Sequence, residues 1–481
     1  MLKINLHPVI CVLFVLFTLH SCMLKKEKAR PNILFIAVDD LRPELNCYGS
    51  EHIYSPNIDR VAQDGILFNK AYCQVPVCGA SRASLLTGIR PSVSRFIDYD
   101  TWADVDVPEA LTLPQHFKNH GYHTLSNGKV FHHKGDKLES WSEAPWLPID
   151  DEQGPKFWRD YQLQENIQTM LDQDGAGPAF EKAYVEDNAY FDGKTADRCI
   201  EDLRRLKAMN KPFFLAAGFL KPHLPFNAPA KYWDMYNTED IHLPDNPHRP
   251  DNAPDASLHN FGELRAYTDI PPAGPLPDTL ARELIHGYYA CVSYTDAQIG
   301  KVLTALEQFE LEENTIVIIW GDHGWNLGEH GLWCKHCNYE TSLRAPLILK
   351  VPWEKGNQKT NALVEFIDIY PTLCELAGIP VPEHVQGESL TKFLNNPELP
   401  GKSYVFSRFH RGESIKSQEF RYTEWLDSTR NRYAEMLYNH GIDPAENYNV
   451  SDEEEYLELI DRLQKVNREN RQKSEGYPSS N

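Results

Sequence analysis

Basic side chains are in the minority in this chain, which has 48 lysines and arginines against 69 aspartates and glutamates and a net charge of −21. Because nucleic-acid binding depends on neutralising phosphates with basic residues, this balance excludes a general affinity for nucleic acid. Any anion must therefore be bound in a local basic pocket. With 481 residues, 41% of them hydrophobic, the chain is too long for one small module and should fold into two or three packed units.

The cysteines give no sign of a disulfide framework or of a structural zinc site. Two of the ten, Cys11 and Cys22, lie in the N-terminal leader described below. The other eight are scattered over a chain large enough to build its own core, so we expect no disulfide scaffold. Cys334 and Cys337 have the spacing of a zinc-ligand pair, but no second pair lies at zinc-site spacing.

The apolar run near the N-terminus, residues 9–19, is too short to span a bilayer but has the length of the hydrophobic region of a secretory signal. It ends in Leu19-His20-Ser21-Cys22, which resembles a bacterial lipobox, in which the cysteine is lipidated and becomes the mature N-terminus. We therefore expect a signal peptide over residues 1–21 and a charged tether over residues 22–31. The protein would be exported to the periplasm or outer membrane and anchored there through Cys22. The alternative is an ordinary signal peptide cut nearby.

Two buried strands are predicted to end in acidic residues. Residues 33–38 form an unbroken apolar run followed by Asp39 and Asp40, and residues 315–320 repeat the pattern before Asp322. Such runs are typical of parallel strands buried on both faces. In open parallel sheets, ligands bind beyond the carboxyl ends of the strands, which is where both acidic clusters fall.

The rest of the chain predicts an α/β fold with a mostly parallel sheet. Further candidate strands are residues 213–219 and 347–351, and apolar residues recur at helical spacing from Leu284 to Leu306. Residues 222–277 contain 11 of the 33 prolines and predict long loops that wall a binding pocket. Residues 381–481 predict a small α+β subdomain with an antiparallel sheet.

Three short runs in this subdomain, residues 404–408, 420–426 and 433–438, have the character of β-strands. They are followed by a predicted amphipathic helix, and Ser451 with Glu454 has the spacing of a capping box for that helix.

Residues 77–91 read Val-Cys-Gly-Ala-Ser-Arg-Ala-Ser-Leu-Leu-Thr-Gly-Ile-Arg-Pro. A cysteine followed by small residues and an arginine at the opening of a helix would have a lowered thiol pKa and an anion-binding helix terminus. This indicates a reactive group at Cys78. Taken alone, the pattern also fits a cysteine packed in the core.

The same segment resembles the signature of the type I sulfatase family: Cys, any residue, Pro or Ala, any residue, Arg, and then a helical stretch ending near Thr87-Gly88. Ala80 stands where animal sulfatases usually have Pro, a form met in bacterial members, so the maturation enzyme is left open. Other segments resemble, in order, those of the iduronate-2-sulfatase branch of the family. They are Val38-Asp39-Asp40-Leu41-Arg42-Pro43, Ser55-Pro56-Asn57-Ile58-Asp59, Asn127-Gly128-Lys129-Val130-Phe131-His132, Lys221-Pro222-His223-Leu224-Pro225-Phe226, Gly321-Asp322-His323-Gly324-Trp325, Gly328-Glu329-His330-Gly331 and Trp333-Cys334-Lys335.

The resemblance covers most of residues 32–380, which it predicts to be the catalytic domain. It implies an alkaline-phosphatase-like sandwich, with a large, mostly parallel sheet between layers of helices. It also implies that a formylglycine-generating maturation enzyme oxidises Cys78 to formylglycine, whose hydrated aldehyde is the nucleophile.

A metal site is predicted from the acidic strand ends. One aspartate after a strand could simply cap a helix, but Asp39, Asp40 and Asp322 together offer the carboxylate oxygens that Ca²⁺ or Mg²⁺ requires. The resemblance adds His323 and the formylglycine oxygen from Cys78 as ligands, and implies one calcium ion. An imidazole is the least typical of these ligands for so hard a cation.

The resemblance also implies roles for the charged groups. Arg82 would hold the nucleophilic hydroxyl in its ionised form, and Asp322 would be its base. Lys129 and Lys335 would bind the sulfate oxygens, which makes them the local basic pocket that an acidic molecule needs.

Two histidines complete the predicted mechanism by resemblance. His223 would protonate the departing sugar oxygen, and His132 would deprotonate the remaining hydroxyl so that sulfate is expelled. His133, His330 and His336 lack such support and are expected to lie outside the set of groups that touch the substrate.

The expected substrate is a sulfated polysaccharide or its oligosaccharides, cleaved from a chain end at the 2-O-sulfate of a uronic acid. Algal ulvan or carrageenan and animal heparin or dermatan are candidates, and residues 95–102, 152–188 and 227–277 would set the specificity. Two alternatives remain. One is a phosphatase or phosphonate monoester hydrolase of the same superfamily, and the other is a lipoprotein that binds sulfated glycans without cutting them.

Overall fold

The computed structural model describes residues 30–148 and 158–476. The expected signal peptide, Cys22 and most of the expected tether therefore lie outside the described residues, as do residues 152–157 of one expected specificity loop. Within the described ranges, no helix combines the length and the apolar composition that crossing a membrane requires. The eight cysteines among the described residues are all free.

A seven-stranded sheet forms the centre of the molecule, in the order β11-β2-β10-β7-β1-β5-β3. β1 (Asn32–Val38) pairs in parallel with β7 (Thr315–Gly321) on one side and with β5 (Phe213–Phe219) on the other. Every residue of these three strands is buried, as their unbroken apolar runs predict. β3 (His123–Gly128) is parallel to β5. The predicted strand at residues 347–351 is β10 (Leu347–Lys350), and it runs antiparallel to β7 and to β2 (Ile66–Tyr72).

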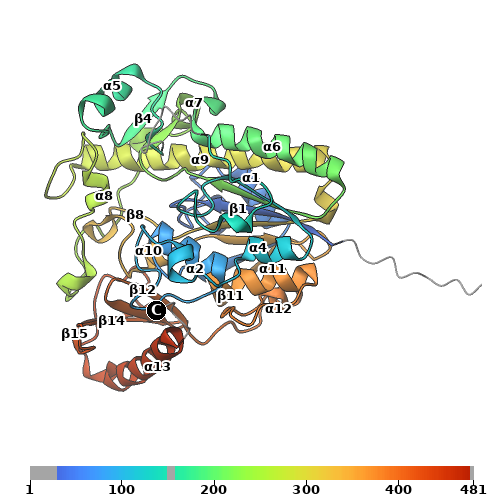
Figure 1. The fold of residues 1–481 in the computed structure, drawn as a ribbon. Helices are drawn as coiled ribbons and strands as arrows, with labels where there is room; N and C mark the ends of the chain where they lie inside the picture. The colour runs from blue at the N-terminus through green and yellow to red at the C-terminus, as the bar shows by residue number, and fades with distance from the viewer. Residues whose placement is uncertain (1–29, 149–157, 477–481) are drawn as a thin grey trace, which may run out of the picture.

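Helices cover both faces of this sheet (Figure 1). α6 (Phe191–Met209) and α9 (Asp278–Gln308) lie on one face, and α2 (Cys78–Thr87), α4 (Leu113–Asn119) and α11 (Ile369–Ala377) lie on the other. Alternate side chains of β1 enter two separate hydrophobic clusters: Ile36 packs with the α6 and α9 layer, whereas Phe35 packs with the α2, α4 and α11 layer. The predicted α/β sandwich is confirmed.

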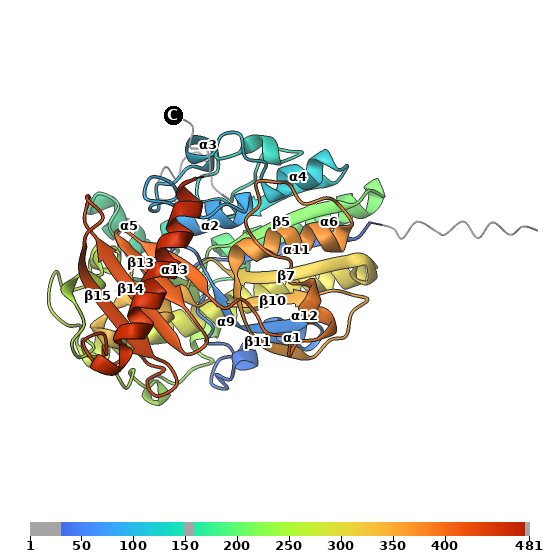
Figure 2. The same cartoon turned by 90° about the horizontal axis from the view of Figure 1, so that it is seen from below.

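A second, antiparallel sheet lies near the C-terminus. Its strands are β12 (Val405–Phe409), β13 (Gly412–Lys416), β14 (Phe420–Leu426) and β15 (Arg432–Asn439), in that order. α13 (Leu457–Glu475) crosses one face of this sheet, as Figure 2 shows, and its Ile460 and Leu463 pack on Ile415 and Tyr422.

The predicted capping box at Ser451 and Glu454 is wrong. A 3-10 turn, Glu454–Tyr456, precedes α13, so the α-helix begins only at Leu457. Glu453 occupies the N-cap of the turn, and it makes no side-chain capping hydrogen bond. Ser451 is buried in the loop that leaves β15.

The remaining elements are short and lie mainly in connections. The strands are β4 (Phe180–Ala183), β6 (Phe226–Pro229), β8 (Asn326–Leu327), β9 (Trp333–Cys334) and β11 (Gln358–Glu365). The helices are α1 (Pro56–Gln63), α3 (Ala103–Asp106), α5 (Gln164–Asp172), α7 (Ala230–Trp233), α8 (Gly262–Arg265), α10 (Glu340–Leu343) and α12 (Thr391–Asn395).

The sheet topology brings four chain segments to one edge. Because β1, β3, β5 and β7 are parallel, the residues that follow them emerge at the same edge of the sheet. These residues include Asp39 after β1, Lys129 after β3, Leu220 after β5 and Asp322 after β7.

Candidate active site

Cys78 is the first residue of α2, as the sequence predicts, and only 3% of its surface is exposed. Its Sγ lies 3.2 Å from Nδ1 of His132. The next residue must be glycine, because a Cβ at Gly79 would lie 2.2 Å from the backbone oxygen of Tyr99. Since every residue of α2 is buried, Cys78 is mounted on a helix that packing holds in place.

The three predicted acidic ligands meet next to this helix. Asp39, Asp40 and Asp322 are fully buried, and one oxygen of each lies within 4.8 Å of the others. Asp40 has a left-handed backbone conformation, with φ of 59°, and its N–H donates to Oδ1 of Asp322 at 3.0 Å. Cys78 and His323 form an overlapping group with Asp322.

The cluster fits a hard divalent cation. Burial of several carboxylates together is costly unless positive charge compensates them, and carboxylate oxygens are the ligands that calcium and magnesium prefer. His323 supplies a further test. Its Nδ1 lies 2.9 Å from the carbonyl oxygen of Gly324, so Nε2 faces the cluster, 3.4 Å from Oδ1 of Asp40. This Nε2 is buried without a hydrogen-bond partner, as a metal-ligand atom would be.

Arg82 joins the acidic cluster to the segment that follows β3. Its Nε donates to Oδ2 of Asp322 at 2.8 Å, and its Nη2 donates to Oδ1 of Asp39 at 2.9 Å. Nη1 donates to the carbonyl oxygens of Lys129 and Val130, at 2.5 and 3.0 Å. These hydrogen bonds go to carboxylates and carbonyls, so the influence of Arg82 on residue 78 is electrostatic.

Two lysines supply further positive charge. Nζ of Lys129 lies 2.5 Å from Oδ2 of Asp39, and Nζ of Lys335 lies 3.1 Å from Oδ1 of Asp40. Burial alone would lower the pKa of Lys129, but Asp39, together with Cys78 and Asp322, outweighs it and raises that pKa above its ordinary value. Burial would lower the pKa of Lys335 as well, but its acidic neighbours, Asp40 foremost, raise it well above its ordinary value, so both lysines are cations.

The two predicted catalytic histidines lie on different sides of this group. His132 contacts the thiol of Cys78, and burial, reinforced by the charge of Lys129, lowers the pKa of His132 to about 3. Nε2 of His223 lies 3.9 Å from Oδ2 of Asp40, and its Nδ1 lies 2.5 Å from the carbonyl oxygen of Leu224.

Sequence reasoning missed Glu263, a carboxylate that joins two of the predicted residues. Its Oε1 lies 2.7 Å from Nζ of Lys335 and 3.3 Å from Nε2 of His223. Burial would raise the pKa of Glu263, but Lys335 and His223 lower it well below its ordinary value. Glu263 lies in α8, within the proline-rich residues 227–277, where no motif marks it.

The structure thus brings together Cys78, Arg82, Lys129, His132, His223, Asp322, His323 and Lys335 with Asp39 and Asp40. A family model described as sulfatase matches residues 31–379.

The chain belongs to the sulfatase family.

Sulfatases are sulfuric ester hydrolases, and the family generally uses a formylglycine and a metal ion. A second model, described as N-sulphoglucosamine sulphohydrolase, C-terminal, matches residues 328–473. Iduronate 2-sulfatase of Mus musculus is 34% identical to this sulfatase, over 90% of this chain and 93% of that protein. The resemblance inferred from the motifs is confirmed.

Solved structures share the fold of this sulfatase. The phosphonate monoester hydrolase of Silicibacter pomeroyi superposes with a TM-score of 0.77 at 21% identity, over 92% of this chain and 96% of that one. A protein described as a 2-O GAG sulfatase superposes with a TM-score of 0.70 at 23% identity, over 93% of each chain. The predicted alkaline-phosphatase-like architecture is therefore confirmed.

The candidate active site of the sulfatase opens into a cleft of about 1360 Å³. Cys78, Lys129, His132, His223 and Lys335 line one part of it. The three expected specificity loops also line it, through residues 97–99, 158–159, 256–260, 262–263 and 266–267. The C-terminal sheet contributes a wall that the sequence did not predict, formed by residues 409–411, 425 and 433.

The other histidines have different surroundings. His133 and His336 line the cleft, and His133 stacks on Trp102 with ring centroids 4.1 Å apart. His330 instead has its Nε2 2.8 Å from the carbonyl oxygen of Ala445, which connects the 3-10 turn Glu329–Gly331 to the C-terminal region.

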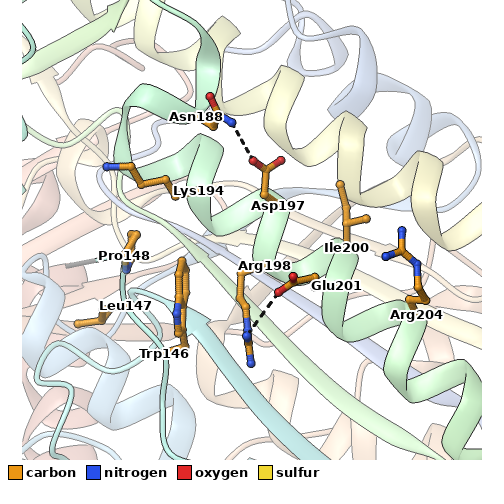
Figure 3. Close-up of a pocket in the computed structure, with 10 residues that line it drawn as sticks. All are labelled: Trp146, Leu147, Pro148, Asn188, Lys194, Asp197, Arg198, Ile200, Glu201 and Arg204. Carbon is orange, nitrogen blue, oxygen red and sulfur yellow. Dashed lines mark hydrogen bonds and ion pairs between the residues drawn. The ribbon is translucent and has the colours of Figure 1, made fainter. Parts of the chain in front are cut away.

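A second pocket, of about 630 Å³, lies along α6 (Figure 3). Its walls hold polar side chains that pair with one another: Asn188 donates to Asp197 at 3.2 Å, and Arg198 lies 3.5 Å from Glu201. None of the predicted catalytic residues lines this pocket. We therefore assign the sulfatase chemistry to the larger cleft.

Proposed function

We propose that this sulfatase removes a sulfate ester from a sugar at the end of a sulfated oligo- or polysaccharide. The observation that carries the proposal is the meeting of a buried carboxylate cluster, a helix-mounted Cys78 and two buried lysines beside one large cleft. The names of two similar proteins, iduronate 2-sulfatase and a 2-O GAG sulfatase, support the 2-O-sulfate of a uronic acid as the ester cleaved. Ulvan, carrageenan, heparin and dermatan are the candidate polysaccharides.

The proposed nucleophile is a formylglycine made from Cys78 by a maturation enzyme. The hydrated aldehyde supplies a hydroxyl group that attacks the sulfur of the ester. In the structure, Sγ of Cys78 stands in for that oxygen, so its contact with His132 locates the partner of the reacting group.

Asp39, Asp40, Asp322 and His323 are the residues that would hold the metal ion, together with the oxygen of residue 78. We propose calcium, because three carboxylates form an oxygen-rich, hard ligand set. When bound, such a cation polarises the sulfate oxygens and the nucleophilic hydroxyl.

The positive charges of the site bind and orient the ester. Lys129 and Lys335 are placed to bind sulfate oxygens, since both residues line the same cleft as Cys78. Arg82 fixes Asp39 and Asp322 and favours the ionised hydroxyl of residue 78 through its charge. Asp322 is the proposed base for that hydroxyl.

The two histidines carry out the proton transfers, one to the sugar and one from residue 78. His223, at the cleft wall, donates a proton to the departing sugar oxygen. His132, 3.2 Å from the side chain of residue 78, takes a proton from that residue's remaining hydroxyl when sulfate leaves. The two histidines therefore act on opposite partners of the same reaction.

The test is to express the chain with a formylglycine-generating enzyme and measure sulfate release from defined oligosaccharides sulfated at the 2-, 3-, 4- or 6-position. We expect release from the 2-O-sulfate at a chain end. The Cys78→Ala variant should release none, and an active Cys78→Ala variant would overturn the proposed nucleophile.

A phosphonate or phosphate ester is the second candidate substrate, because the fold superposes on a phosphonate monoester hydrolase. In that reaction the same charged side chains would act on an ester of phosphorus instead of an ester of sulfur. Matched aryl sulfate, aryl phosphate and aryl phosphonate esters separate the candidates. The sulfate ester should have the highest kcat/KM, and a faster phosphonate ester would reverse the assignment.

We also propose that the protein is exported and anchored in the membrane through lipidated Cys22. The support is the sequence Leu19-His20-Ser21-Cys22 after a short apolar run. Fractionation of cells that express the full chain tests this: the wild-type protein should be found with the membranes and Cys22→Ala should not.

A further inference from the structure

Among the residues that the structure describes, Arg159 is a buried charge without a polar partner. It is 8% exposed, and its Nε and Nη1 atoms are buried with no hydrogen bond to any of those residues. Within the described residues its guanidinium makes neither a hydrogen bond nor an ion pair. Burying an unpaired charge costs several kcal/mol, so such a group normally has a partner that is either another side chain or a ligand.

Three other buried arginines show the usual arrangement in this molecule. Arg82 pairs with two aspartates, and Arg421 pairs with Glu340 and with Glu446, at 2.9 Å from the latter. Arg408 likewise pairs with Glu413, at 3.1 Å. Arg159 differs from these residues in one further respect, since it alone of the four lines the active-site cleft.

The guanidinium is held in a fixed position against the cleft wall. Its central carbon lies 4.9 Å from the centroid of the Tyr267 ring, and its backbone oxygen accepts a hydrogen bond from Nδ2 of Asn227 at 2.6 Å. A guanidinium that lies over an aromatic ring keeps its N–H donors in its own plane, where a carboxylate or a sulfate can accept two of them.

The position of Arg159 relates it to the sulfate-binding groups. Tyr267 follows α8 by two residues, and the same short segment carries Glu263, which binds both Lys335 and His223. One segment therefore supports both the sulfate end of the cleft and the ring on which Arg159 stacks. Asn338, which lines the same cleft, adds a buried Oδ1 that has no hydrogen-bond partner in the described part of the chain, an acceptor suited to a sugar hydroxyl.

We propose that Arg159 binds a second oxyanion of the substrate, so that this sulfatase selects saccharides with another anionic group besides the sulfate that it removes. The inference rests on the proposed saccharide sulfatase function and deepens it. The second oxyanion is a carboxylate of a uronic acid or a second sulfate ester, and both offer the oxygens that a guanidinium binds.

Three matched saccharides test the proposal and show whether the second oxyanion is a carboxylate or a second sulfate. Each carries the sulfate that the wild-type enzyme removes fastest. One has a hydroxymethyl group at C5, the second a carboxylate there, and the third a sulfated hydroxymethyl group. We expect the wild-type enzyme to prefer one of the charged saccharides over the neutral one by about 10- to 100-fold in kcat/KM, the range of a charge-assisted hydrogen bond. The charged saccharide that is preferred identifies the source.

In Arg159→Met the ratio of kcat/KM for the charged and the neutral saccharide should fall to about one, and Arg159→Lys should restore part of the preference. The matched control is Arg204→Met. Arg204 also stacks on an aromatic ring, with its guanidinium carbon 5.6 Å from the ring centroid of Phe309, but it is exposed and lies in the second pocket (Figure 3). That variant should keep the wild-type ratio.

A binding measurement keeps this test independent of catalysis. The saccharides are titrated into Cys78→Ala protein and into protein that carries both Cys78→Ala and Arg159→Met. The ratio of the Kd values for neutral and charged saccharides should show the preference in the first protein and its loss in the second. Equal Kd values for charged and neutral saccharides would overturn the proposal, as would an unchanged preference in Arg159→Met. If the matured wild-type enzyme releases sulfate from none of the saccharides, the proposed function fails, and the Kd ratio still decides the role of Arg159.

Discussion

The surroundings of Cys78 and the cleft wall at Arg159 compensate buried charge in different ways. Next to Cys78, the guanidinium of Arg82 contacts Asp39 and Asp322, and Lys129 adds a second cation to Asp39. At the wall, Arg159 contacts a tyrosine ring and no acid among the described residues. Paired charges hold the protein architecture together, whereas an unpaired one is available to a ligand. The two regions should therefore respond differently to the same kind of substitution.

The largest effect is expected for Arg82→Met. It leaves Asp39 and Asp322 buried with less compensating charge, so the free energy of unfolding should fall by about 3–5 kcal/mol and sulfate release should be lost. Denaturant unfolding and a sulfate assay measure the two losses. Arg421→Met is the control: it breaks a buried pairing outside the cleft, so it should lose similar stability while the folded fraction keeps its activity. Wild-type stability in Arg82→Met would contradict the account of this region.

Removal of the metal ion should have the next largest effect. If the free calcium concentration is one hundred times the Kd, calcium binding stabilises the folded protein by about 3 kcal/mol. A calcium chelator should remove that stability. Thermal unfolding with chelator, and again after calcium is added back, measures it without an activity assay. In Asp40→Asn protein the chelator should change the melting temperature little. Equal shifts in the variant and the wild-type protein would place the ion elsewhere.

Glu263→Gln tests the link between the two regions. The amide keeps the shape of the side chain but removes the charge that faces Lys335 and His223, so kcat/KM should fall about tenfold, mainly through KM for the sulfated saccharide. Glu263→Asp should recover part of the loss, because the charge returns on a shorter side chain. A fall in kcat alone, with KM unchanged, would argue against a role in positioning Lys335.

The smallest effect on stability is expected for Arg159→Met. The substitution removes a buried charge that has no polar partner in residues 30–148 and 158–476, and it keeps most of the side-chain volume. The free energy of unfolding should therefore change by less than about 1 kcal/mol or rise. Denaturant unfolding beside Arg82→Met makes the contrast direct. A loss of several kcal/mol in Arg159→Met would show that the wall, like the site around Cys78, depends on its arginine for folding.

Sequence alone predicted the strands whose residues are all buried, because a short, unbroken apolar run is compatible with few structures other than a buried strand. β5 has the predicted bounds, and β1 and β7 differ from the predicted runs by one residue each. The direction of β10 was not predictable in this way, since a short apolar run has the same pattern in either orientation.

The residues of the active site likewise divide into those that the sequence could predict and those that it could not. Residues within motifs, such as Lys335 and His223, could be named from the sequence. Glu263 and Arg159 could not, because their roles depend on contacts between loops that are distant in sequence: Glu263 meets Lys335 across 72 positions, and Arg159 meets Tyr267. The wall contributed by the C-terminal sheet is a contact of the same kind.

The most direct test of the account is the mass of the tryptic peptide that contains residue 78, in protein matured in its native host. Cleavage after Lys70 and Arg82 releases residues 71–82 as one peptide. Formylglycine predicts that sulfur and two hydrogens are replaced by one oxygen, and that protein carrying this mass releases sulfate. An intact cysteine in protein that still releases sulfate would contradict the account.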